Sequence, residues 1–173
     1  MTWKTFHRRG DILRSVIAVV DTRRDGLLPM DVDGVAETFG DELTLLAALQ
    51  LKWHTRLAGR IDRALTGQPL DLDDAVAAAW RATATDLPGV RAVLDHYREH
   101  PLDDAMAVAM AKATSKEHMM LAMMAGRCSV GDEGGAPIGA ALEERARAGR
   151  HRREADEPTR PSLLDRLRAA LVA

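Results

Sequence analysis

Cysteine and aromatic residues are scarce in this sequence. Aromatics make up 3% of the 173 residues, so the core has to be built mainly from aliphatic side chains. The single cysteine, Cys128, excludes an internal disulfide and is typical of a reducing compartment. No apolar run approaches the roughly 20 residues that span a bilayer, so we expect no membrane span.

A clear targeting signal is also lacking. The stretch KTFHRR before ILRSVIAVV has the basic-then-apolar order of a signal peptide. Asp11 and Arg14 interrupt that order, however, and no small-residue cleavage site follows. Together with the lone cysteine, this predicts a cytoplasmic protein.

The chain has no large excess of charge of either sign and no common catalytic motif. Its formal net charge is -2, which gives no overall attraction to nucleic acid. Basic residues gather at 4–9 and 145–153, but neither stretch has interleaved aromatics, and no helix-turn-helix is recognisable. A G-x-S-x-G elbow, a phosphate loop and a dinucleotide fingerprint are all absent. The sequence therefore argues against nucleic-acid binding and against nucleophilic catalysis.

What is present is apolar residues at spacings of three and four, the period of amphipathic helices. The longest such pattern covers residues 41–66. Asp41 is the expected N-cap of this helix, and Gly67 is expected to end it in the left-handed conformation. One arc of the helix holds six apolar residues, namely Leu46, Leu49, Trp53, Leu57, Ile61 and Ala64. We predict an all-α, single-domain bundle of four to six helices with this helix at its centre.

The C-terminal part differs in composition from the rest. We assign 1–149 to the bundle, 150–161 to a charged flexible linker, and 162–173 to a short amphipathic helix. A twelve-residue helix is marginal alone in water, so it needs a surface to dock on. Its apolar stripe would contact the bundle itself or a partner protein, through Leu163, Leu164, Leu167 and Leu171.

Histidines on separate expected helices raise the alternative of a metal site in the bundle core. The candidate ligands are His54, His96, His100, His118 and Glu117, with zinc, iron or manganese as the metal. His54 with His96 and His100 resembles the histidine sets of hemerythrin-type bundles and of three-histidine bundles of the DinB kind. Neither His54 nor His118 has the acids four or five residues on that hemerythrin-type sites use. A packed, hydrogen-bonded histidine is the competing interpretation of His54.

Methionines around His118 suggest copper as a further, weaker metal hypothesis. Met106, Met110, Met119, Met120, Met123 and Met124 surround that histidine, and Cys128 follows. Soft thioethers select Cu(I). Methionine at helical spacing is more often flexible core filler, which favours packing over copper.

Glu117 tests the local structure of residues 102–127. If this stretch is one continuous helix, Glu117 shares a face with Met106, Met110 and Met124. A buried carboxylate then needs a partner such as His54, an arginine or a metal. If the helix breaks at Ala113, Glu117 instead completes a capping box with Thr114. We favour the continuous helix because Ala and Met are good helix formers.

These patterns favour a non-enzymatic helical interaction or adaptor protein, acting through a protein partner or through self-association of apolar helix faces. The alternative is a metal-binding helical bundle.

Overall fold

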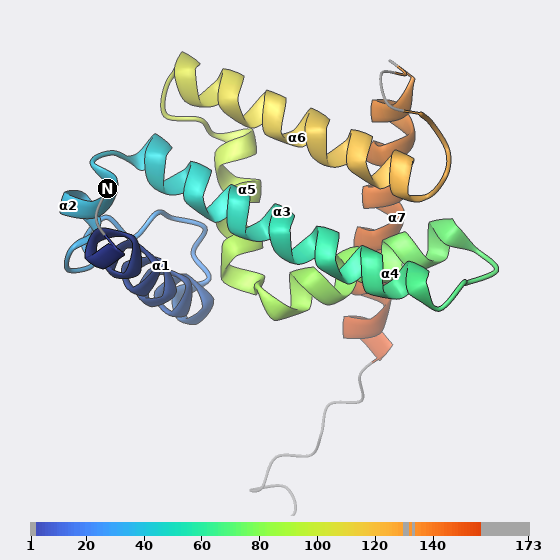
Figure 1. Ribbon diagram of the computed structural model, residues 1–173, viewed down its shortest axis with the longest axis horizontal. Helices are drawn as coiled ribbons and strands as arrows, with labels where there is room; N and C mark the ends of the chain where they lie inside the picture. The colour runs from blue at the N-terminus through green and yellow to red at the C-terminus, as the bar shows by residue number, and fades with distance from the viewer. Residues whose placement is uncertain (1–2, 130–131, 133, 157–173) are drawn as a thin grey trace, which may run out of the picture.

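The chain is all-helical over the residues that the computed structural model describes, which are 3–129, 132 and 134–156 (Figure 1). The helices are α1 (Trp3–Arg23), α2 (Val35–Phe39), α3 (Glu42–Thr66), α4 (Leu72–Asp86), α5 (Pro88–Glu99), α6 (Asp104–Met124) and α7 (Gly135–Asp156). The all-α prediction is confirmed. There are seven helices in this part rather than four to six, because Pro88 and Pro101 bound a short α5 and the five-residue α2 stands apart.

Helix α3 crosses the middle of the molecule, as expected (Figure 1). α4 returns along α3, and α7 packs across both α4 and α6. α1 packs mainly against α5 and α2 rather than against α3. Helix α1 therefore covers α3 only sparsely.

The sequence pattern of α3 is reproduced in detail. The Asp41 carboxylate caps the helix by accepting from the Thr44 N–H at 2.7 Å. The buried residues are Leu45, Leu46, Leu49, Trp53, Leu57 and Ile61, which is the expected arc with Leu45 added and Ala64 only partly buried. The helix ends at Gly67 as expected, but the predicted left-handed conformation of that glycine is wrong: Gly67 has a φ of -74°, and Gln68 takes the left-handed conformation with a φ of 50°.

Two tryptophans mark the centre of the core. Trp53 of α3 and Trp80 of α4 are fully buried, with ring centroids 5.6 Å apart in an edge-to-face arrangement. Met106 and Met110 of α6 are also buried in this core. The two methionines thus act as the core filler that their helical spacing favours.

The C-terminal prediction is only partly within the described residues. α7 continues through 150–156, which the composition assigns to a linker; that stretch has no Gly or Pro to end a helix. The expected helix 162–173, with Leu163, Leu164, Leu167 and Leu171, lies outside the described residues. The division into 1–149, 150–161 and 162–173 stays a prediction. None of the described helices is long and apolar enough to cross a membrane.

Candidate functional site

The structure places the four candidate histidines in three different surroundings. His54 is half-buried on α3, beside Glu117 and Arg91. His96 and His100 lie together on α5 with stacked rings, 5.1 Å between centroids. His118 of α6 contacts Glu143 of α7. Among the described residues, no group of three His, Cys, Asp or Glu side chains is placed to hold a metal ion. The metal hypothesis stays a prediction, without a gathered ligand set to support it.

The sulfur-containing residues expected as copper ligands also lie in different surroundings. Met119 and Cys128 meet, with Sδ and Sγ 3.8 Å apart. Met106 and Met110 lie in the apolar core instead, so the structure separates part of the set that the sequence groups around His118.

Glu117 is buried in a continuous α6, as we favoured, and its partner is an arginine. Its Oε1 accepts from Trp80 Nε1 at 3.0 Å and lies 3.7 Å from Arg91 NH1. Arg91 is only 4% exposed, and its guanidinium lies 4.7 Å from the ring centroid of Trp53. Arg91 Nε and NH1 have no hydrogen-bond partner among the described residues. Charge attraction to Glu117, the ion pair with Asp95 and the indole faces therefore hold this cation.

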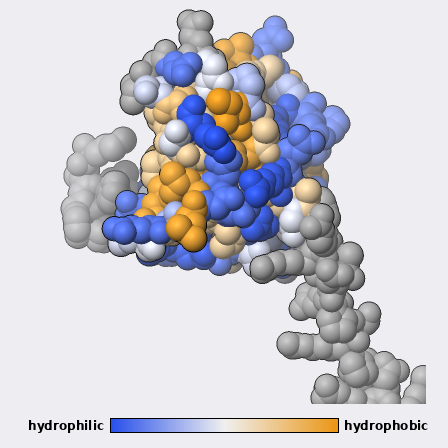
Figure 2. Space-filling view, turned by 90° about the vertical axis from the view of Figure 1, so that its right-hand side faces the viewer, coloured by the Kyte–Doolittle hydropathy of each residue, from blue (hydrophilic) through white to orange (hydrophobic). Residues whose placement is uncertain are grey.

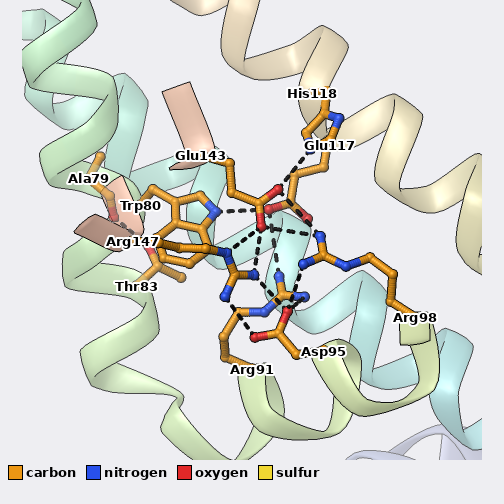
Figure 3. Close-up of polar contacts among 10 residues, drawn as sticks. All are labelled: Ala79, Trp80, Thr83, Arg91, Asp95, Arg98, Glu117, His118, Glu143 and Arg147. Atoms are coloured by element: carbon orange, nitrogen blue, oxygen red, sulfur yellow. Dashed lines mark hydrogen bonds and ion pairs between the residues drawn. The ribbon is translucent and has the colours of Figure 1, made fainter. Parts of the chain in front are cut away.

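Glu143 collects three cationic or potentially cationic partners at the crossing of α5, α6 and α7 (Figure 3). It contacts Arg98 NH1 at 3.2 Å, Arg147 NH2 at 2.6 Å and His118 Nε2 at 2.7 Å. Arg147 also bonds Asp95 in a two-pronged arrangement, at 2.6 and 3.0 Å. We call the whole set the ion-pair cluster, consisting of Arg91, Asp95, Arg98, Glu117, His118, Glu143 and Arg147.

The arginines keep Asp95 and Glu143 ionised. Burial on its own raises the pKa of Glu143, but the hydrogen bond with His118 and the charges of Arg147 and Arg98 outweigh it, so the pKa lies far below its ordinary value. Burial likewise raises the pKa of Asp95, and the Arg147 hydrogen bond and neighbouring arginine charges lower it further than burial raises it. Ionised Asp95 and Glu143 thus join α5 to α7 through their ion pairs with Arg98 and Arg147.

Of this cluster, only Glu117 and His118 are among the site residues expected from the sequence. Its signals are two i,i+4 charge pairs, Arg91 with Asp95 and Glu143 with Arg147, next to apolar helix faces. Such pairs are common on solvated faces, so they do not by themselves indicate burial.

An apolar ridge on α3 lies between two grooves. One groove, of about 610 Å³, runs between α1 and α3; the other, of about 320 Å³, runs between α3 and α6. Leu43, Ala47 and Leu51 line both grooves and form the ridge between them. Leu51 is 67% exposed although it is a large apolar residue. We call the ridge and its two flanks the α3 groove.

The rim of the α3 groove carries positive charge only. Its charged lining residues are Arg9, Lys52, Lys112 and Lys116, with no acid among the lining residues. Three of the four lysines of the chain are in this set. Within the part of the chain that the structure describes, every ion pair uses Arg or His as its cation, so these lysines have no intramolecular partner.

A second apolar surface, near the α3–α4 connection, is interrupted by hydrophilic residues. Figure 2 shows the end of the molecule where α3 connects to α4, with apolar residues set beside strongly hydrophilic ones. Leu70 and Leu72 are exposed in this connection. Neither leucine lines the two grooves beside α3, and we take the α3 groove as the stronger candidate for binding.

A third pocket, of about 490 Å³, lies between α6 and α7 and is called the α6–α7 pocket here. Its polar lining residues are Arg98, Thr114, Ser115 and His118; two prolines and four alanines complete the wall.

Comparison with known proteins identifies no relative: no protein-family model, no curated protein and no solved structure matches this chain. The geometry of the described residues is therefore the only basis for a function.

Proposed function

We propose that this protein is a non-enzymatic interaction module that binds an amphipathic helix of a partner protein in the α3 groove. The observation that supports it is the apolar ridge of Leu43, Ala47 and Leu51, of which Ala47 and Leu51 are exposed. The lysines on its rim have no ion-pair partner among the described residues. An exposed apolar strip bordered by charge is typical of a protein-binding surface. The lone Cys128 supports a cytoplasmic setting.

The length of the groove fits a helix. Its lining on α3 extends from Leu43 to Thr55, which is about 18 Å at 1.5 Å per residue. That length matches about twelve residues of a partner helix, enough for apolar anchors at i, i+3 or i+4, and i+7. The grooves on the two sides of the ridge would each take one row of these anchors.

The charge of the rim indicates the chemistry of the partner. A helix with Asp or Glu beside its apolar stripe would pair with Lys52, Lys112 and Lys116, which steers association and fixes orientation. A second copy of this chain is a poorer occupant, because a two-fold contact through this face would bring the same lysines of both copies together. We therefore propose an acidic amphipathic helix from another protein.

A selection from a displayed library of helical peptides tests this function. The wild-type protein is the bait, and a Leu51→Glu variant is used for counter-selection. We expect enriched peptides to combine helically spaced apolar residues with acidic flanks, and their affinity to fall at least tenfold, about 1.4 kcal/mol, on Leu51→Glu. Affinity should also weaken as salt is added.

Two further variants control this experiment. Leu70→Glu alters a leucine in the α3–α4 connection that is even more exposed than Leu51, and it should leave binding unchanged. Lys112→Gln together with Lys116→Gln should weaken acidic peptides without changing the free energy of unfolding by more than about 0.5 kcal/mol. If no peptide prefers the wild type over Leu51→Glu, or if basic flanks are enriched, the proposal is wrong.

A further inference from the structure

The α6–α7 pocket has a polar end and an apolar wall. Arg98 of α5 and His118 of α6 supply the polar end. The rest of the wall is mainly alanine and proline, whose small side chains leave the space open. Its volume of about 490 Å³ lies in the range of small-molecule sites, which is roughly 300–1,000 Å³.

The two polar groups are held in place from behind. Glu143 is 5% exposed and does not line the pocket. It contacts Arg98 NH1 at 3.2 Å and His118 Nε2 at 2.7 Å. A buried carboxylate thus orients both side chains before any ligand arrives, which reduces the ordering that binding requires.

Arg98 and His118 each have one nitrogen atom that these contacts do not use. Among the hydrogen bonds of the described residues, none uses Arg98 Nε or His118 Nδ1. Figure 3 shows the second ring nitrogen of His118 turned away from Glu143. Because Glu143 occupies Nε2, donation from Nδ1 to a ligand requires the imidazolium form.

The charges of the ion-pair cluster indicate which charge a ligand in the α6–α7 pocket should carry. Three arginines, Arg91, Arg98 and Arg147, balance Asp95, Glu117 and Glu143. A proton on His118 adds one positive charge, and a monoanionic ligand beside it restores the balance. A monoanion beside the imidazolium form of His118 therefore leaves no uncompensated charge at this partly buried site.

We propose that the α6–α7 pocket binds a small organic carboxylate, with its oxygens on Arg98 and His118 and its apolar body against the alanine wall. The apolar wall favours a carboxylic acid with a short hydrocarbon or aromatic body over inorganic phosphate. This site is separate from the α3 groove and does not depend on the function proposed there.

Titration of the full chain with benzoate, followed by NMR of the ¹⁵N-labelled histidine side chains, tests the proposal. We expect saturable shifts of the His118 ring nitrogens. Benzamide, which has the same shape without the charge, should bind at least tenfold more weakly, and inorganic phosphate should also be weaker. Equal binding of benzamide would overturn the proposal, as would phosphate binding as tightly as benzoate, because the site would then not select an organic carboxylate.

A pair of substitutions on α6 places the binding in the pocket without disturbing the ion-pair cluster. Ala111 is exposed and lines the pocket, so Ala111→Phe should fill it and abolish the benzoate-dependent shifts. Val108 is 53% exposed on the same helix and is not a lining residue, so Val108→Phe should leave them unchanged. Saturable shifts that persist in Ala111→Phe, or no saturable shift in the wild type, would contradict the proposal.

Discussion

Three arginines of the ion-pair cluster and three lysines of the α3 groove lie in different surroundings. Arg91, Arg98 and Arg147 are enclosed in the ion-pair cluster, where each faces at least one carboxylate. The described lysines on the α3 groove face none. The guanidinium group suits multi-pronged pairing with carboxylates, whereas the ammonium group is a flexible and strongly hydrated point charge. The arginines of the first region therefore have carboxylate partners within the chain, whereas the lysines of the second have none among the described residues.

The largest effect should follow from breaking the cluster at its centre. Glu143→Leu removes the carboxylate shared by Arg98, Arg147 and His118. Because this leaves buried positive charge uncompensated, we expect the free energy of unfolding to fall by about 3–5 kcal/mol. Urea denaturation followed by circular dichroism measures it.

The neighbouring residue provides a matched control for that variant. Glu144 is exposed, so Glu144→Leu should change the free energy of unfolding by no more than about 0.5 kcal/mol. A loss below about 1 kcal/mol for Glu143→Leu would mean that apolar packing alone holds α7, and the contrast between the two regions would then be lost.

Glycine-to-alanine substitutions should have opposite effects on stability on α7 and on α3. A Cβ on Gly139 would overlap the backbone carbonyl of His118, so Gly139→Ala has to push α7 away from α6. We expect a loss of about 1–3 kcal/mol from this overpacking. Gly59 on α3 has nothing within 4 Å of an added Cβ, and Gly59→Ala should stabilise by about 0.5–1 kcal/mol through helix propensity. Thermal melts of both variants measure this, and a loss in both would show that α3 is as tightly constrained as the α6–α7 crossing.

Local features of this fold were predictable from the sequence, and features that depend on several helices were not. The Asp41 cap and the apolar arc of α3 follow from the spacing within one segment. The burial of Glu117 follows from its place on the methionine face of α6. The cluster around Glu143 requires α5, α6 and α7 to meet, and no spacing within one helix encodes that meeting. The α3 groove exists because α1 packs mainly on α5. The spacing of apolar residues in α1 does not determine which helix it packs against.

His54 lies where the two regions meet, and its titration provides the smallest and most local test. It lines the α3–α6 side of the groove, and the charges of Glu117 and Arg91 both act on it. Burial lowers the pKa of His54 below the ordinary 6.5; Glu117 opposes this shift and Arg91 adds to it.

A lowered pKa at His54 fixes the sign of the pH effect. Below pH 6.5 the unfolded chain binds a proton that the folded chain does not, so the free energy of unfolding falls as the pH drops towards the folded pKa. We expect His54→Gln to lose less stability than the wild type between about pH 7.5 and pH 5, in urea titrations at each pH. The lower limit stays above 4.5 and 3.8, the ordinary pKa values of Glu143 and Asp95, so protonation of these two acids contributes little. Thr55→Gln, a non-titrating change at the next position, should keep the wild-type slope. An unchanged slope in His54→Gln would mean that the groove side of α3 is solvated well enough to leave this histidine outside the influence of the cluster.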